Sequence, residues 1–223
     1  MWVVKLGGSL SRDASLPRWL DMLAEFGRGR VTVVPGGAGF ADAVREAQAH
    51  WGFGDVPAHN MAVLAMAQTA HMLHAIEPRL VMVHDEAGIR RTLHAGRPAL
   101  WLPLDLIRDA PDMLTSWEVT SDSLALWLAR QLNVERLVLV KACPVSPVST
   151  IAELGASGVV DGRFAQWARD AAFMIEVVQG DQIERVRDAL LGAPQQVLPA
   201  VLPAVLSTRN GGQRGRTRRK PAA

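Results

Sequence analysis

Short apolar runs recur along the first 180 residues and predict the strands of a β-sheet. They are rich in Val, Ile and Leu and show little alternation with polar residues, as is typical of strands that are covered on both faces. The predicted strands are Trp2–Leu6, Arg30–Val34, Leu80–His84, Ala99–Pro103, Arg136–Lys141 and Met174–Val178.

Helical periodicity lies between these runs. The predicted helices are Leu16–Phe26, Ala38–Ala49, Pro57–Ile76, Ser121–Leu132 and Gln182–Leu191. Ser15 is placed to cap the first helix, and Pro57 suits the first turn of the third. Strands that alternate with helices indicate an α/β fold, an αβα sandwich with a mostly parallel central sheet. In such folds, ligands bind beyond the carboxyl ends of the strands.

The last thirty residues differ from the rest. We predict one folded domain over residues 1–193 and a tail over residues 194–223 that is Pro-rich and then basic. The segment Thr208–Ala223 carries six cations and no acid. It also lacks apolar residues to bury, so we expect this tail to be disordered.

Composition limits the possible functions. The formal net charge is +2, but the six cations of the tail leave 18 basic against 22 acidic residues in the body, or −4. A mildly acidic body argues against a nucleic-acid partner. No apolar run approaches the ~18 residues of a membrane span, and no signal-peptide pattern is present. A single cysteine excludes an internal disulfide. We therefore expect a cytoplasmic protein.

The first motif is "VVKLGGSL", in which a strand delivers Lys5 and then turns at Gly7 and Gly8. Glycines without Cβ atoms let backbone N–H groups approach phosphate oxygens closely, and Lys5 adds a compact positive charge. The alternative is a tight turn beside a surface lysine.

A second strand ends in the same way, in "VTVVPGGAGFADAV", with a turn at Gly36 and Gly37 before a helix. Helix N-termini attract anions. The spacing matches neither the dinucleotide-binding Gly-x-Gly-x-x-Gly pattern nor a Walker loop. Two such turns within forty residues indicate a phosphate site more strongly than one.

The third motif is "SWEVTSDSLALWLARQL", where Thr120 or Ser121 is placed to cap a helix and Asp122 falls in its first turn. Asp122 is either a favourable partner of the helix dipole or an acid that orients nearby lysines or a magnesium-linked water. Lys141 ends a later apolar strand, and a right-handed crossover brings the preceding helix beside that strand. We therefore place Lys141 near Asp122 and the ATP phosphates, with a surface lysine as the equal alternative.

In order and spacing, these motifs resemble the amino acid kinase family, most closely its archaeal-type branch of methanofuran biosynthesis. The similar stretches also include "SGVVDGRF" and "EVVQGDQIERVRDALLG", and together they cover most of residues 1–192. The resemblance implies an acceptor half followed by a nucleotide half. It implies ATP as phosphoryl donor, with Mg²⁺ held chiefly by the phosphates and no metal site made by the protein.

The resemblance and the position of each residue in the chain together suggest roles for individual residues. Lys5, Asp122 and Lys141 are the catalytic candidates. Phosphate and ATP binding fall to Gly7, Gly8, Ser9, Asp161 and Gly180, and acceptor binding to Gly36, Gly37, Gly39 and His59. For Asp161 and Gly180 an ordinary turn is an equal alternative. A metal site at His71, His74 and His84 lacks a completing carboxylate or cysteine, so packing is favoured.

One segment departs from the family pattern. After the strand at Val138–Val140 the family usually reads close to Thr-Asp-Val-Asp-Gly, whereas this chain reads "KACPVSP". The expected activity is a kinase that converts a small phosphate monoester, aminomethylfuranylmethyl phosphate, into a diphosphate. The alternatives are a carboxylate kinase that forms an acyl phosphate, and a degenerate subunit that binds a phosphorylated ligand without turnover. We expect a homo-oligomer or a partner subunit.

Overall fold

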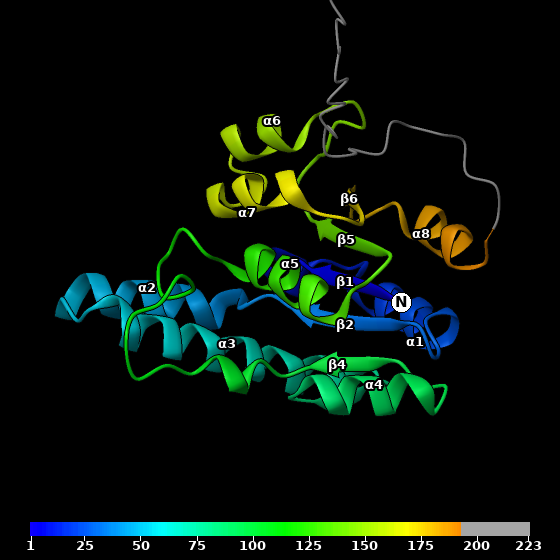
Figure 1. Cartoon of the computed structure of the whole chain (residues 1–223), viewed down its shortest axis with the longest axis horizontal. Coiled ribbons are helices and arrows are strands. Elements are labelled where there is room, and N and C mark those ends of the chain that lie inside the picture. Colours follow the sequence, from blue (N-terminus) through cyan, green and yellow to red (C-terminus); the bar gives the residue numbers. More distant parts are fainter. Residues whose placement is uncertain (193–223) are drawn as a thin grey trace, which may run out of the picture.

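The computed structural model describes residues 1–192. Its centre is a six-stranded sheet in the order β3-β4-β2-β1-β5-β6, in which every neighbouring pair is parallel (Figure 1). The strands are β1 (Trp2–Leu6), β2 (Val31–Pro35), β3 (Val81–Val83), β4 (Ala99–Trp101), β5 (Arg136–Lys141) and β6 (Met174–Gln179). The predicted parallel α/β sandwich is confirmed. Residue 193 and the predicted tail 194–223 lie outside the described residues.

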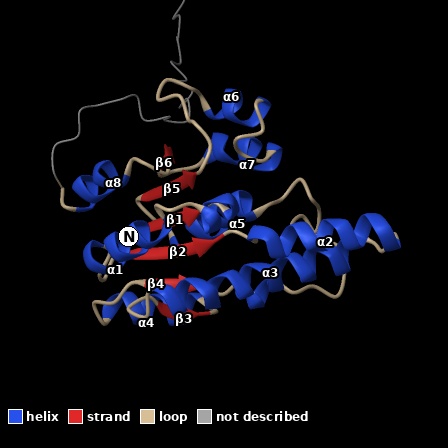
Figure 2. Cartoon of the chain, turned by 180° about the vertical axis from the view of Figure 1, so that it is seen from behind, coloured by secondary structure: helices blue, strands red, loops and turns tan. Residues whose placement is uncertain are grey.

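Helices cover both faces of the sheet, as Figure 2 shows from behind. They are α1 (Leu16–Phe26), α2 (Ala38–Trp51), α3 (Asp55–Ile76), α4 (Glu86–His94), α5 (Ser121–Leu132), α6 (Ile151–Ala156), α7 (Gly162–Trp167) and α8 (Ile183–Leu190). Short 3₁₀ turns lie at Gly8–Arg12, Leu104–Leu106 and Ala168–Asp170. In both views α2 and α3 lie side by side and project beyond the carboxyl ends of the strands.

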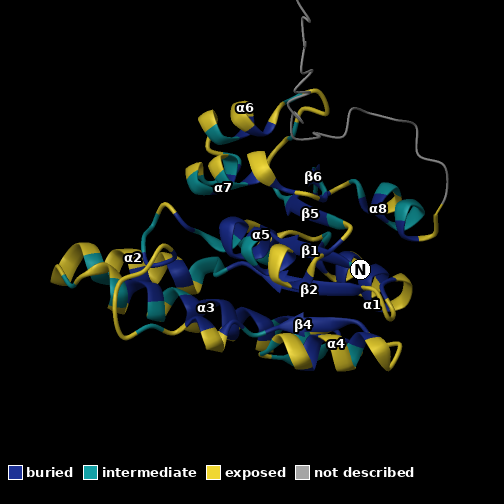
Figure 3. Cartoon of the chain, viewed as in Figure 1, coloured by how far each residue is buried: buried dark blue, intermediate teal, exposed yellow. Residues whose placement is uncertain are grey.

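Alternate residues of the central strands pack into two separate cores, which explains why the strand sequences are apolar without a break. Val3 and Val34 are fully buried in a core that includes α5, whereas Val4 and Val33 are buried in a core that includes α1. The buried strands are dark blue in Figure 3. Because side chains alternate, every second residue of β1 and β5 faces α5.

Some local predictions need correction. The helices α4, α6 and α7 were not predicted, and the limits of several strands and helices shift by one or two residues. Ser15 occupies the N-cap position of α1, but its side chain accepts no capping hydrogen bond because its backbone is already in the helical region (φ −76°, ψ −15°). Thr120 does cap α5, accepting a bond from the backbone of Asp122. Among the described residues, no helix combines the length and apolar character that crossing a membrane requires.

The order of the strands marks where a ligand is expected. β1 pairs with β2 on one side and with β5 on the other, so the direction in which the chain adds strands reverses at β1. Open parallel sheets bind ligands outside the carboxyl ends of the strands at such a point. The carboxyl ends of β1 and β5 carry Lys5 and Lys141.

Candidate functional site

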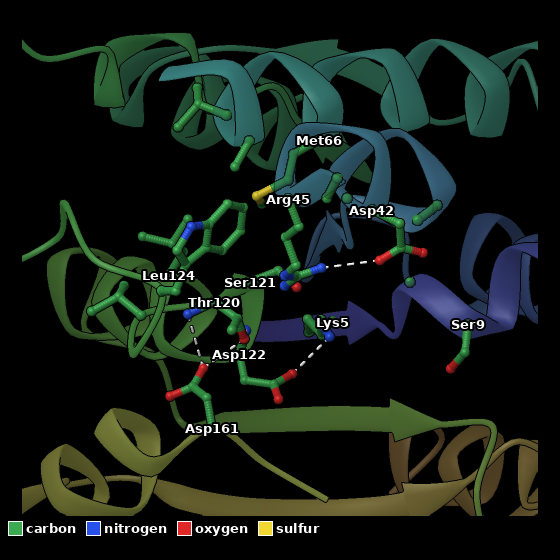
Figure 4. A pocket seen from close by; sticks show the side chains of 18 of the residues that line it. Lys5, Ser9, Asp42, Arg45, Met66, Thr120, Ser121, Asp122, Leu124 and Asp161 are labelled. Atoms are coloured by element: carbon green, nitrogen blue, oxygen red, sulfur yellow. Dashed lines mark hydrogen bonds and ion pairs between the residues drawn. The ribbon is translucent and has the colours of Figure 1, made fainter. Parts of the chain in front are cut away.

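A buried carboxylate joins two lysines at this edge of the sheet. Lys5 Nζ lies 2.7 Å from Asp122 Oδ1, and Lys141 Nζ donates a hydrogen bond of 2.5 Å to Asp122 Oδ2. Asp122 Oδ1 accepts no hydrogen bond, so Lys5 and Asp122 form an ion pair without one. The side chains of Lys5, Asp122 and Lys141 are 4%, 5% and 11% exposed. Figure 4 shows Lys5 and Asp122 pointing toward each other.

Strand register and helix capping create this cluster. Lys5 pairs with Leu139, two residues before Lys141, so both lysines project to the face that α5 covers. Asp122 lies in the first turn of α5, where the helix dipole favours a negative charge. The sequence prediction that Lys141 lies beside Asp122 therefore agrees with the geometry.

The three charges perturb one another. Burial raises the pKa of Asp122, but the positive charges of Lys5 and Lys141 outweigh this effect and hold the pKa below its ordinary value of 3.8. Burial lowers the pKa of Lys141 below 10.5, and the charge of Lys5 lowers it further, while Asp122 opposes both. Two lysines and one aspartate carry a net charge of +1, which suits an anionic ligand.

Asp161 anchors the helix that carries Asp122. Its Oδ2 accepts hydrogen bonds from the backbone nitrogen and hydroxyl of Thr120, at 3.1 and 2.6 Å, and from the backbone nitrogen of Ser123 at 3.2 Å. Its Oδ1 accepts from the Ser123 hydroxyl at 2.5 Å and caps α7 through Phe164. Asp161 thus uses both of its carboxylate oxygens to hold α5 and α7 together.

The two Gly-Gly turns pack backbone against backbone. A Cβ atom on Gly36 would lie 2.4 Å from the backbone nitrogen of Gly8, and one on Gly8 would lie 2.9 Å from that of Ala38. Gly7 is equally confined, because its Cβ would lie 2.8 Å from the carbonyl oxygen of Val140. The lack of Cβ atoms thus lets the turns after β1 and β2 pack closely against each other and against the end of β5. Ala38 has a φ of +49°, a left-handed backbone for a residue with a side chain.

A cavity of about 520 Å³ opens beside these turns. Predicted site residues that line it are Lys5, Gly8, Ser9, Gly37, Gly39, His59, Asp122, Lys141 and Asp161. His59 lines the wall from α3, and its Nε2 lies 2.8 Å from the carbonyl oxygen of Leu106. Gly7, Gly36 and Gly180 do not line the cavity. Instead, the backbone nitrogen of Gly180 donates a hydrogen bond to the carbonyl oxygen of Lys141, and its carbonyl oxygen accepts one from the Trp19 indole. Gly180 therefore stabilises the end of β5.

Further lining residues were not singled out from the sequence. Polar ones are Arg12, Asp42, Arg45, Asp55 and Ser116, and apolar ones include Ala62, Val63, Met66, Trp117 and Val119. Arg12 comes from the 3₁₀ turn after β1, and the others come from the projecting helices α2 and α3 and from the loop before α5. No local spacing links these segments, so only a tertiary structure brings them together.

Comparison with known proteins identifies the relatives of this chain. A model described as the amino acid kinase family matches residues 1–144. The chain belongs to this family. A curated relative, [5-(aminomethyl)furan-3-yl]methyl phosphate kinase of Methanocaldococcus jannaschii, is 27% identical over 141 residues. That alignment covers 62% of this chain and 64% of the relative, so it spans less than two thirds of the relative's length.

Solved structures share the amino acid kinase fold. Uridylate kinase from Archaeoglobus fulgidus superposes with a TM-score of 0.64 at 17% identity, covering 86% of this chain and 97% of that chain. UMP kinase from Bacillus anthracis gives 0.59 at 17% identity, with 86% and 91% covered. An isopentenyl phosphate kinase gives 0.55 at 17% identity, with 87% and 97% covered. At these identities the likeness shows the fold alone.

The segment that departs from the family pattern begins at Lys141. Cys143, Pro144 and Pro147 are exposed, and only Lys141 of this segment lines the cavity. The departure thus replaces two acids of the family pattern with an exposed loop, while the strand end supplies a cation that contacts Asp122.

Proposed function

We propose that this protein is an ATP-dependent kinase that phosphorylates a small phosphate monoester to a diphosphate. Membership of the amino acid kinase family supports a phosphotransferase. The observation that carries the proposal is the buried carboxylate Asp122, which aims two lysines at a cavity beside two Gly-Gly turns. Positioned cations and backbone N–H groups are what phosphoryl transfer requires of a protein.

The three residues of the cluster divide two tasks in this mechanism. Lys5 and Lys141 neutralise negative charge on the phosphoryl group and on the leaving phosphates, and Asp122 fixes their directions. The backbone of the Gly8 turn approaches the phosphates closely. No general base is required, because an ionised oxygen of a phosphate monoester is already a nucleophile. The hydrogen-bonded His59 and the ion-paired Asp122 fit a site that moves no proton.

Magnesium would accompany ATP in this mechanism, supplying positive charge to its phosphates. Within residues 1–192 there is no group of three or more His, Cys, Asp or Glu side chains that could hold a metal. The two aspartates nearest the lysines, Asp122 and Asp161, are engaged by lysines and by α5. On this proposal, magnesium would be held chiefly by the phosphates of the nucleotide.

The acceptor we propose is [5-(aminomethyl)furan-3-yl]methyl phosphate, the compound in the name of the Methanocaldococcus relative. The cavity of about 520 Å³ has room for a small ring, and Val63, Met66 and Trp117 give it an apolar wall. A role in methanofuran-type cofactor synthesis in the cytoplasm follows from this acceptor. We also propose a homo-oligomer, which sedimentation analysis of the purified chain would test.

A direct assay tests the function. Purified protein with MgATP and the furanylmethyl phosphate should release ADP in step with a diphosphate product, followed by ³¹P NMR. ADP release only with carboxylate acceptors would replace the proposal with an acyl-phosphate kinase. ATP binding without turnover of either acceptor class would favour a degenerate, ligand-binding subunit.

A further inference from the structure

Arg45 enters the cavity from the wall opposite the lysine cluster. It lies in α2, and Figure 4 shows its side chain extending from that helix toward Lys5 and Asp122. The side chain is 47% exposed, so its guanidinium remains accessible to a ligand in the cavity. Lys5 and Lys141 share the charge of Asp122, whereas Arg45 belongs to a separate network.

Two contacts orient the guanidinium of Arg45, one with Trp117 and a weaker one with Asp42. Its central carbon lies 4.4 Å from the centre of the Trp117 ring, a cation–π contact. The Trp117 indole nitrogen donates a 2.5 Å hydrogen bond to Gln48 Oε1, which fixes the ring. Arg45 Nη1 also lies 3.0 Å from Asp42 Oδ1. Because the Asp42 side chain is 68% exposed, this ion pair is weak and exchangeable.

We propose that Arg45 binds the phosphate group that the acceptor already carries, and that Trp117 is a positioning residue for Arg45. This inference rests on the proposed kinase function and deepens it by naming the group that selects the acceptor. A guanidinium grips two oxygens of an oxyanion with its planar fork. A phosphate monoester has three non-ester oxygens, so two can bind Arg45 while the third attacks. A carboxylate has only two oxygens, so it cannot bind Arg45 through two oxygens and still have a free oxygen for the attack.

The transfer balances without a further reactant. The free oxygen of the acceptor phosphate forms a bond to the γ-phosphorus of ATP. The bond from that phosphorus to the β–γ bridging oxygen breaks, and ADP leaves with the electron pair. With a dianionic monoester, no proton has to be removed. Arg45 lowers the repulsion between the two phosphate groups as they approach, while Lys5 and Lys141 serve the donor side.

Substitutions at Arg45 and Trp117 test the assignment. For Arg45→Met we expect the KM for the furanylmethyl phosphate to rise about 10-fold or more, since charge-assisted hydrogen bonds are lost. The KM for ATP should stay within about twofold, because Arg45 serves the acceptor. Arg45→Lys should rescue part of the loss. Trp117→Leu should raise the acceptor KM with little change in kcat. Arg18→Met is the matched control, because Arg18 pairs with Glu184 on the surface and does not line the cavity.

Equilibrium binding separates this inference from the kinase function. Calorimetry without ATP should show that the wild type binds the same monoester and that Arg45→Met binds it about 10-fold more weakly or worse. If the wild type binds the monoester without phosphorylating it and Arg45→Met binds it more weakly, the kinase function fails while the Arg45 assignment stands. Unchanged monoester affinity in Arg45→Met, an equal rise in the KM for ATP, or no binding by the wild type would overturn the Arg45 assignment.

Discussion

Replacing Asp122 by asparagine removes the only negative charge of the lysine cluster while keeping its shape. Two lysines whose side chains are 4% and 11% exposed then lose the carboxylate with which both form ion pairs. Breaking a buried ion pair by removing one partner typically costs about 3 to 5 kcal/mol. We expect a loss near 3 kcal/mol, because burial and the charge of Lys5 already lower the pKa of Lys141, which therefore loses its proton more readily.

Urea unfolding at pH 7 of the wild type and Asp122→Asn measures this loss. Glu184→Gln is the control, since its surface pair with Arg18 should contribute about 1 kcal/mol or less. The pKa of Asp122 is lower in the folded than in the unfolded protein, so its stabilisation is present above pH 3.8 and lost as pH falls through the lower folded value. The difference in free energy of unfolding between the wild type and Asp122→Asn should therefore become smaller at acidic pH.

Turnover gives an independent check of the same reasoning. Without Asp122 the cluster has a higher positive charge, so ATP binding should persist, while kcat should fall because the lysines are no longer aimed. A stability loss below about 1 kcal/mol, or a loss equal to that of Glu184→Gln, would refute the idea that Asp122 is the electrostatic centre of the site.

Further substitutions probe the rest of the site. Lys5→Ala should reduce kcat about 100-fold or more, measured as ADP release, and unchanged turnover would remove Lys5 from the mechanism. Lys141→Met should weaken ATP binding or lower kcat by at least about 10-fold, with partial rescue in Lys141→Arg. Because the pKa of Lys141 is lowered, activity should fall with rising pH before 10.5, and Lys141→Arg should shift this limb to higher pH. Gly36→Ala should destabilise the fold by about 1 to 3 kcal/mol in urea, since its Cβ would meet a backbone nitrogen at 2.4 Å, whereas Gly162→Ala, which has open space around it, should change little.

The sequence was sufficient to predict the part of the site that lies on the sheet. Lys5 and Lys141 end buried strands, and Asp122 begins the helix that crosses over to the second of them. Strand alternation and the handedness of crossovers are general rules, so the meeting of these three residues could be inferred without coordinates.

The opposite wall could not be predicted in the same way. Arg45 and Trp117 are 72 positions apart and meet only because α2 and α3 project past the strands and the loop before α5 folds across them. No short-range pattern encodes that contact. The missed helices are a different case, because Thr150 and Glu153 form a capping box that is visible in the sequence before α6. The helix that they begin has only six residues, too few for a periodic apolar face to stand out.

The segment after β5, where this chain leaves the family pattern, bears on whether the site is active or degenerate. With Lys5 and Asp122 alone, the site would hold a neutral ion pair with little attraction for an anion. Lys141 binds the second oxygen of the same carboxylate, so the cluster gains a net positive charge without leaving Asp122 unpaired. Burying the charge of Lys141, whose side chain is only 11% exposed, costs free energy, and the same burial lowers its pKa. A protein that had lost its anionic ligand would gain nothing from that cost, so Lys141 favours a site that still binds an anion, and the assay for ADP release then separates the active kinase from a subunit that only binds.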